Sequence, residues 1–233
     1  MSRADLTKAP TDVSTMFDGV AGRYDLMNAV LALGQDRRWR RAMVDALQLD
    51  PTRPGTVLDI AAGTGTSTAA IAASGHRAIA SDFSLGMMRE GTARQSDLPF
   101  VGADATRLPF RTDAFDAAVN SFGLRNVHDP AAALAEMVRV VRPGGAVVIC
   151  EFSTPTNRAF RHVYRNYLMK ALPAVASRAA SNGPAYSYLA ESIMAWPDQE
   201  GLRQWFIDAG LTHVQYRNLS GGIVALHRGI VPA

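Results

Sequence analysis

The chain has 233 residues, of which 48% are hydrophobic and 19% are charged, and its formal net charge is +3. These values exclude a disordered chain and fit one globular domain. No stretch reaches the roughly 20 consecutive apolar residues of a membrane-spanning helix, and the first residues lack the apolar segment of a signal peptide. Cys150 is the single cysteine, and the five histidines show no metal-ligand spacing. We therefore expect a cytoplasmic protein without a structural metal.

The N-terminal part predicts a helical cap ahead of the first strand. Residues 1–15 are polar and are expected to be flexible. From Phe17 to Leu49, apolar residues recur every three or four positions, which predicts helices. The segment from Asp50 to Gly55 is rich in proline and ends this cap, which we assign to residues 16–50.

Beyond the cap, short apolar runs alternate with helical patterns. The expected strands are 56–61, 77–81, 98–101, 115–120 and 146–152, with helices near Thr68, near Met87 and over 131–141. Such alternation is typical of βαβ units, so the sequence predicts an α/β fold with a mostly parallel sheet. A helical insertion over 154–196, a helix over 199–209 and strands at 212–216 and 223–226 complete the chain. We expect one domain over 16–229, with a cofactor-binding core over 56–152 and a final helix and strands over 199–229.

A glycine-containing turn follows the first expected strand. Asp59 precedes the loop that contains Gly63, Thr64 and Gly65. Glycines at such a turn let the backbone approach a ligand, and helix N-terminal amides attract its carboxylate or phosphate. A dinucleotide-binding loop would have a third glycine where Thr68 stands. Asp59 instead suits the cationic amino group of S-adenosyl-L-methionine, which has a carboxylate and no phosphate; a tight turn without a ligand is the alternative.

Polar residues also stand at the ends of the following strands. Asp82 ends the second strand, where a carboxylate can accept both ribose hydroxyls. Asp104 and Ala105 follow the third strand, where they suit an adenine ring, and Ser121 lies at the end of the fourth. In a parallel sheet these positions share one edge, where ligands bind. The combination predicts a cleft for S-adenosyl-L-methionine as methyl donor.

Several segments resemble the C-methyltransferases of ubiquinone and menaquinone biosynthesis. The segment from Arg139 to Ser153, with its central Pro-Gly-Gly, matches the family signature in full. Segments 121–126, 185–193 and 218–228 match further family hallmarks. An N-terminal signature from Tyr24 to Trp39 is kept in part, because Ala32 stands in place of Ser and Asp36 in place of His.

This resemblance implies a seven-stranded Rossmann-like sheet, S-adenosyl-L-methionine as cofactor and methylation of a ring carbon on a polyprenylated quinol. It assigns cofactor binding to Thr64, Asp82, Asp104, Ala105 and Ser121. Together with Asp59, Gly63 and Gly65, these are the candidate cofactor residues. Lys8 and Lys170 are the only lysines beside many arginines. This bias suggests a GC-rich bacterium, and hence a menaquinone-type ring.

Methylation of a ring carbon needs a base or an oxyanion-stabilising group beside the neighbouring hydroxyl. Arg125 is a candidate for stabilising the phenolate or orienting a water, since a guanidinium keeps its protons and is a poor base. His128 is a candidate base, and Glu151 ends a strand at the same edge. The structural alternatives are an ion pair for Arg125, a solvated loop for His128 and a buried strand end for Glu151.

The quinol ring and its isoprenoid tail need an apolar site. Tyr24, Tyr186 and Tyr188 are candidate contacts to the ring, with core packing as the alternative. On a helix near 158–172, Arg158, Arg161 and Arg165 share one face, while Phe160 and Tyr164 lie on another. This pattern is typical of an interfacial helix on an anionic membrane surface. A helix that covers the sheet, or a homodimer contact, has the same pattern.

Other functions remain open at this stage. A methyltransferase could act on a different acceptor, such as a sterol or a soluble phenol. A non-catalytic subunit of a quinone-biosynthesis assembly would bind S-adenosyl-L-methionine without turnover. Thr68 argues against a nicotinamide dehydrogenase, and the net charge of +3 argues against a nucleic-acid-binding protein.

Overall fold

The computed structural model describes residues 7–19, 32, 34–50, 52–167 and 183–233, and the side chains of 183–186 are not part of that description. Within this part, the strands are β1 Thr56–Ile60, β2 Arg77–Asp82, β3 Phe100–Gly102, β4 Phe115–Ser121, β5 Val141–Phe152, β6 Thr212–Leu219 and β7 Val224–Ile230. The helices are α1 Pro10–Asp18, α3 Asp36–Leu47, α4 Thr66–Ala73, α5 Leu85–Arg94, α6 Pro130–Val140, α7 Arg158–Asn166, α9 Gly183–Ala195 and α10 Gln199–Asp208, with 3-10 turns η1 Leu124–Asn126 and η3 Ser220–Gly222.

One sheet runs through the centre of the described chain. Its strand order is β3-β2-β1-β4-β5-β7-β6. The five strands from β3 to β5 are parallel, whereas β7 runs antiparallel to both β5 and β6. The chain reverses direction along the sheet between β1 and β4, which is the point where such sheets bind ligands. The predicted α/β fold with a mostly parallel sheet is confirmed.

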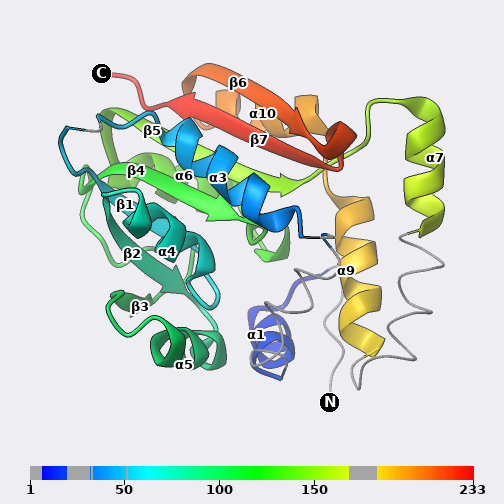
Figure 1. Ribbon diagram of the computed structural model, residues 1–233, viewed down its shortest axis with the longest axis horizontal. Coiled ribbons are helices and arrows are strands. Elements are labelled where there is room, and N and C mark those ends of the chain that lie inside the picture. Colours follow the sequence, from blue (N-terminus) through cyan, green and yellow to red (C-terminus); the bar gives the residue numbers. More distant parts are fainter. Residues whose placement is uncertain (1–6, 20–31, 33, 51, 168–182) are drawn as a thin grey trace.

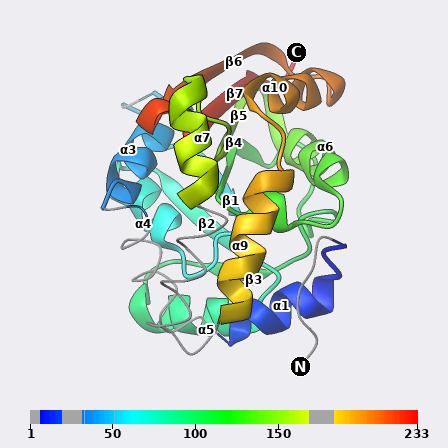
Figure 2. The ribbon, with the colours of Figure 1, turned by 90° about the vertical axis from the view of Figure 1, so that its right-hand side faces the viewer.

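Helices cover both faces of this sheet (Figures 1 and 2). On one face, α6 and α10 pack against Leu58, Val147 and Ile149. On the other face, α3 and α4 pack against Val148 and Cys150. Alternate residues of β5 therefore face opposite helical layers, which explains why this strand reads as a continuous apolar run in the sequence.

Side chains at four helix starts set where the helices begin. Each accepts a hydrogen bond from the backbone amide three residues later, which satisfies a donor that the first turn leaves free. These N-cap residues are Ser84 of α5, Asp129 of α6, Asn157 of α7 and Asp198 of α10.

The structure corrects the expected N-terminus. Residues 10–15, which were expected to be flexible, belong to α1, which begins with Pro10 at its first position. No residue of α1 is fully buried, and its apolar residues Val13, Met16 and Phe17 are half-buried at helical spacing. Of the helical pattern predicted from Phe17 to Leu49, the described residues show helix at the end of α1 and again over Asp36–Leu47. The interval 20–31 lies outside the described residues.

Several strand ends also differ from the prediction. β5 begins at Val141, ahead of the Pro143-Gly144-Gly145 turn, because Val141 still pairs with Phe115 across a register shift. β6 and β7 extend to Leu219 and Ile230, since antiparallel pairing with β5 continues along the whole of β7. β3 starts at Phe100 because the residues before it form a turn from Gln95 to Leu98.

The region beyond the carboxyl ends of the parallel strands is covered by three helices. α1, α7 and α9 all lie at that end of the sheet (Figure 1). Of these, α7 and α9 belong to the predicted helical insertion. Within the described residues, no helix is both long and apolar enough to cross a bilayer.

Candidate active site

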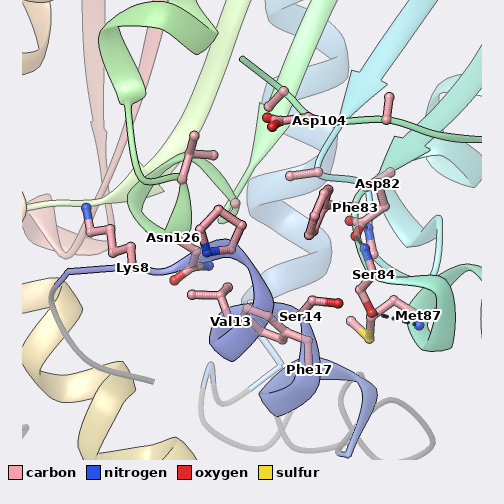
Figure 3. A pocket seen from close by; sticks show the side chains of 18 of the residues that line it. Lys8, Val13, Ser14, Phe17, Asp82, Phe83, Ser84, Met87, Asp104 and Asn126 are labelled. Atoms are coloured by element: carbon pink, nitrogen blue, oxygen red, sulfur yellow. Dashed lines mark hydrogen bonds between the residues drawn. The ribbon is translucent and has the colours of Figure 1, made fainter. Parts of the chain in front are cut away.

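A pocket opens at the carboxyl ends of β1, β2 and β4 (Figure 3). The empty space in and in front of the pocket, open solvent included, is about 860 Å³. The sheet side supplies Gly63 after β1, Asp82 at the end of β2, Asp104 and Ala105 after β3, and Ser121 at the end of β4. The predicted convergence of these five residues on one cleft is therefore observed.

Asp82 organises one side of this pocket. Its Oδ2 accepts a hydrogen bond from the Gly63 amide at 2.7 Å, and its Oδ1 accepts one from the Ser84 amide at 2.7 Å. Gly63 has a φ of 59°, and a Cβ there would lie 3.1 Å from Cε of Met87. The loop therefore approaches Asp82 closely because residue 63 has no side chain. Burial raises the pKa of the Asp82 carboxyl.

The backbone is strained at two neighbouring strand ends. Ala61 after β1 and Phe122 after β4 have φ values of 51° and 59°, although neither is glycine. Both residues line the pocket. Left-handed backbone at residues with side chains is uncommon and concentrates at functional sites, where the surrounding structure holds it in place.

Asp59 lies outside the pocket lining, in the core below the glycine loop. Its Oδ2 accepts a 2.6 Å hydrogen bond from the Thr68 hydroxyl, while its Oδ1 is buried without a hydrogen-bond partner. Burial, with the neighbouring charge of Asp82, raises the pKa of this carboxyl to about 7. Thr68 therefore orients Asp59 through its hydroxyl, a role that glycine at that position could not fill.

Two further candidates also lie outside the pocket lining, although they belong to the glycine loop. Thr64 is buried, and Gly65 packs so tightly that a Cβ would lie 2.7 Å from the Phe100 ring. These two residues shape the loop that carries Gly63.

Arg125 and Glu151 form a buried ion pair beside the pocket. Their exposed fractions are 4% and 0%, and Nη1 of Arg125 lies 3.0 Å and 3.2 Å from the two Glu151 oxygens. The same nitrogen donates to the Phe122 carbonyl, while Nε is buried without a partner among the described residues. Burial raises the pKa of Glu151 and Arg125 opposes that shift. Neither side chain is among the pocket residues, whereas His128 is.

The three candidate tyrosines differ in what the structure describes of them. Tyr188 lies on α9 and is buried, outside the pocket lining. Tyr186 belongs to the same helix, but its side chain is not described, and Tyr24 lies outside the described residues.

The far wall of the pocket comes from the N-terminal segment. Pro10, Val13, Ser14 and Phe17 of α1 line it, together with Lys8. Asp18 fixes this helix to α5 by accepting hydrogen bonds from the Ser84 hydroxyl and from the Gly86 amide, the latter at 2.9 Å. Residue 86 must be small, because a Cβ there would lie 2.6 Å from Asp18 Oδ1.

Sequence reasoning therefore missed part of the site. The lining residues that it missed include Lys8, the α1 residues, Phe83 and Asn126. Phe83 is half exposed directly after Asp82, so its position next to a predicted ligand residue was the available signal. Asn126 lies in a recognised family segment, and its Oδ1 is buried without a hydrogen-bond partner among the described residues. For α1, the available signals were Pro10 at a helix start and the spacing of Val13, Met16 and Phe17. For Lys8, no signal in the sequence was available.

Comparison with known proteins decides the family. The profile of the ubiE/COQ5 methyltransferase family matches residues 4–231. The chain belongs to this family. It is 60% identical over 227 residues to a protein of Mycolicibacterium vanbaalenii named demethylmenaquinone methyltransferase, covering 97% of this chain and 98% of that one. A protein of the same name from Renibacterium salmoninarum is 57% identical over 228 residues, covering 98% of this chain and 95% of that one.

Solved structures show the same fold at low sequence identity. Phosphoethanolamine N-methyltransferase 2 of Haemonchus contortus, in complex with S-adenosyl-L-methionine, superposes with a TM-score of 0.61 at 13% identity, covering 84% of this chain and 53% of that one. The YcgJ protein of Bacillus subtilis gives a TM-score of 0.61 at 16% identity, covering 84% and 99%. Family and fold together confirm the prediction of a methyltransferase that uses S-adenosyl-L-methionine.

The residues present fit this cofactor. Among the described residues, the pocket combines a glycine loop, two carboxylates on successive strand ends and a buried amide oxygen that lacks a partner. Asp104 uses Oδ1 to accept from the amide and the hydroxyl of Thr106, both at 2.8 Å. Its Oδ2 takes no part in these two bonds.

Replacing Asp18 with alanine tests the attachment of α1 to α5. Losing a carboxylate that caps helical amides costs about 1 kcal/mol, so the Kd for S-adenosylhomocysteine should rise about fivefold. Isothermal titration calorimetry measures this change. Asp12→Ala, which removes a carboxylate from the first turn of the same helix, is the matched control, and equal effects of both variants would contradict a specific role of Asp18.

Replacing Asp59 with asparagine tests its raised pKa. The carboxyl titrates near 3.9 in an unfolded chain and at about 7 in the fold. The group therefore favours the folded state below about pH 4, and this contribution is lost as the pH rises to about 7. Relative to the parent, Asp59→Asn should gain about 2 kcal/mol in free energy of unfolding between about pH 5 and about pH 8. Urea denaturation measures it, and a loss instead of a gain would contradict the raised pKa.

Proposed function

We propose that this protein transfers a methyl group from S-adenosyl-L-methionine to a ring carbon of demethylmenaquinol, which yields menaquinol. The observation that carries the proposal is the 55–60% identity to proteins named demethylmenaquinone methyltransferase, over 97–100% of this chain. The sequence identity thus extends beyond the cofactor-binding core to the N-terminal helix and the helical insertion. These two segments lie where an acceptor would enter.

The sheet side of the pocket is assigned to the cofactor. Asp82 would accept from the ribose hydroxyls, because each of its oxygens keeps a lone pair beyond its backbone bond. Asp104 and Ala105 would hold the adenine ring, and Gly63 and Ser121 would border the methionine part. Thr64 and Gly65 support the loop. Asp59 is assigned to the same support, since it is enclosed and bound to Thr68.

S-adenosyl-L-methionine supplies a methyl group that its sulfonium already activates, so the chain must position the acceptor and remove its proton. Holding the ring carbon in line with the methyl is worth on the order of 7–11 kcal/mol. The hydroquinol hydroxyl loses its proton, the ring carbon gains electron density and takes the methyl, and that carbon then releases its own proton to restore the aromatic ring. A base and a group that stabilises the phenolate are both needed.

Arg125, Glu151 and His128 are assigned to the acceptor end. Glu151 holds the Arg125 guanidinium through both of its oxygens, which leaves the unpartnered Nε to orient a water or an acceptor oxygen. His128 lines the pocket, and its imidazole would accept the hydroxyl proton. Tyr24, Tyr186 and Tyr188 remain proposed contacts to the ring.

Product analysis tests the proposed reaction. Purified protein incubated with labelled S-adenosyl-L-methionine should methylate a short-chain demethylmenaquinol, and mass spectrometry should show one added methyl on a ring carbon. A demethylated benzoquinol serves as the competing acceptor. Arg125→Lys should reduce turnover about tenfold or more while its Kd for S-adenosylhomocysteine stays within a few-fold. Methylation of the benzoquinol alone, or of neither ring, would refute the proposal.

We also propose that α7 meets an anionic membrane surface, where a polyprenylated acceptor resides. Arg158, Arg161 and Arg165 lie on this helix, and Phe160, Val163 and Tyr167 expose large apolar side chains at and beyond it. α7 lies at the outer end of the molecule, beyond the carboxyl ends of the parallel strands (Figure 1). Basic residues at an anionic surface contribute about 1 kcal/mol each.

Vesicle sedimentation tests this contact. The double variant Arg158→Glu with Arg165→Glu should bind vesicles containing phosphatidylglycerol at least tenfold more weakly than the parent. The control double variant, Arg53→Glu with Arg111→Glu, lowers the net charge by the same amount at exposed positions outside α7. It should bind these vesicles as tightly as the parent. Equal loss in both double variants, or binding independent of anionic lipid, would contradict the proposed contact.

A further inference from the structure

Lys8 stands at the end of the pocket away from Asp82. Figure 3 shows its side chain on the opposite side of the pocket from Asp82 and Ser84, with the ammonium pointing away from them. The ammonium lies 5.9 Å from the centre of the Trp196 ring. No carboxylate among the described residues lies within 4.0 Å of it, so its charge is not neutralised by an ion pair there.

The neighbouring Arg125 cannot replace this charge. Its Nη1 is shared between both Glu151 oxygens and the Phe122 carbonyl, and its side chain is almost fully buried. Glu151 offsets its positive charge. Among the lining residues that the structure describes, Lys8 is thus the one lysine or arginine.

Two other observations mark this end as a site for a polar ligand atom. Asn126 lines the same pocket, and its Oδ1 is buried without a hydrogen-bond partner in the described part of the chain. Because an amide oxygen only accepts, it suits a hydroxyl of the acceptor ring that keeps its proton. Lys8 itself has a φ of 54°, which is a strained conformation for a residue with a side chain. It is held there at the start of α1, which Asp18 fixes to α5.

We infer that the Lys8 ammonium binds the ionised oxygen of the acceptor. This inference rests on the proposed function, because that reaction develops negative charge on a ring oxygen and the cationic end of the pocket is where such charge is stabilised. When the hydroxyl proton leaves to water or to a base, Lys8 donates a hydrogen bond to the phenolate oxygen and keeps its own protons. The electron pair of the new carbon–carbon bond comes from the ring, and the sulfur keeps the pair of the bond that breaks.

The electrostatics of Lys8 agree with this role. Burial and the charge of Arg125 lower the pKa of its ammonium, and Glu151 raises it in part. A bound anion would stabilise the charged form of this ammonium. Binding of a phenolate should therefore raise the pKa of Lys8.

Binding of a stable anion tests the inference without turnover. The probe is 2-hydroxy-1,4-naphthoquinone, an anion at neutral pH, and neutral 1,4-naphthoquinone is its reference, both with S-adenosylhomocysteine present. Lys8→Met should weaken binding of the anion about tenfold or more, as expected for a lost charge-assisted hydrogen bond, while binding of the neutral quinone changes little. Lys8→Arg should keep most of the preference for the anion, and Lys170→Met, at the chain's other lysine, should keep all of it.

Titration of the two lysines gives a second measurement. Reductive methylation with labelled formaldehyde marks Lys8, Lys170 and the N-terminus, and Lys8→Arg identifies the Lys8 signal by its loss. The pKa of Lys8 should rise when 2-hydroxy-1,4-naphthoquinone binds and should not respond to the neutral quinone.

The outcomes separate this inference from the proposed function. An unchanged anion preference in Lys8→Met, in protein that methylates demethylmenaquinol, would overturn the role of Lys8 alone. A matching loss of S-adenosylhomocysteine affinity in Lys8→Met would also overturn it, because Lys8 would then bind the cofactor's carboxylate. Absence of methylation by the parent with the anion preference intact would refute the proposed function and leave Lys8 as an anion site.

Discussion

The carboxylate of Asp82 connects the segments that build the pocket. One oxygen accepts the Gly63 amide of the glycine loop, and the other accepts the Ser84 amide at the start of α5. Ser84 in turn donates its hydroxyl to Asp18 at the end of α1. Three segments that are distant in sequence are therefore joined by one chain of hydrogen bonds, and each bond involves a charged acceptor, which makes it stronger than a neutral one.

A second group of charges lies at the other end of the pocket. Burying the pair of Arg125 and Glu151 removes both charges from water, which is costly unless their geometry satisfies both groups. The two Glu151 oxygens and the Phe122 carbonyl all accept from Nη1 of the guanidinium, whereas its Nε has no partner among the described residues. This arrangement fixes η1, which carries Asn126 into the pocket. It also sets a nearly neutral background against which the ammonium of Lys8, which has no ion-pair partner among the described residues, has a large effect.

The N-terminal segment is held in place by polar contacts more than by apolar burial. α1 has no fully buried residue, so little apolar burial holds it in place, and polar contacts at Asp18 attach it instead. Segments with few buried apolar contacts open at low cost in free energy. An attachment of this kind suits a wall that must admit a cofactor and an acceptor and then enclose them.

The sequence by itself determined the sheet, the glycine turn and the acids at the strand ends. β1 and β4 are buried on both faces and therefore read as apolar runs, and Asp82 and Asp104 follow such runs directly. Local spacing sufficed for these features because consecutive βα units place their strand ends at one edge. Only the tertiary structure decided that Asp59 is buried in the core and that Glu151 forms an ion pair with Arg125. It also decided that Lys8 and Asn126 line the pocket. These results depend on contacts between segments far apart in the chain, such as Asp18 with Ser84, and no periodicity within either segment encodes them.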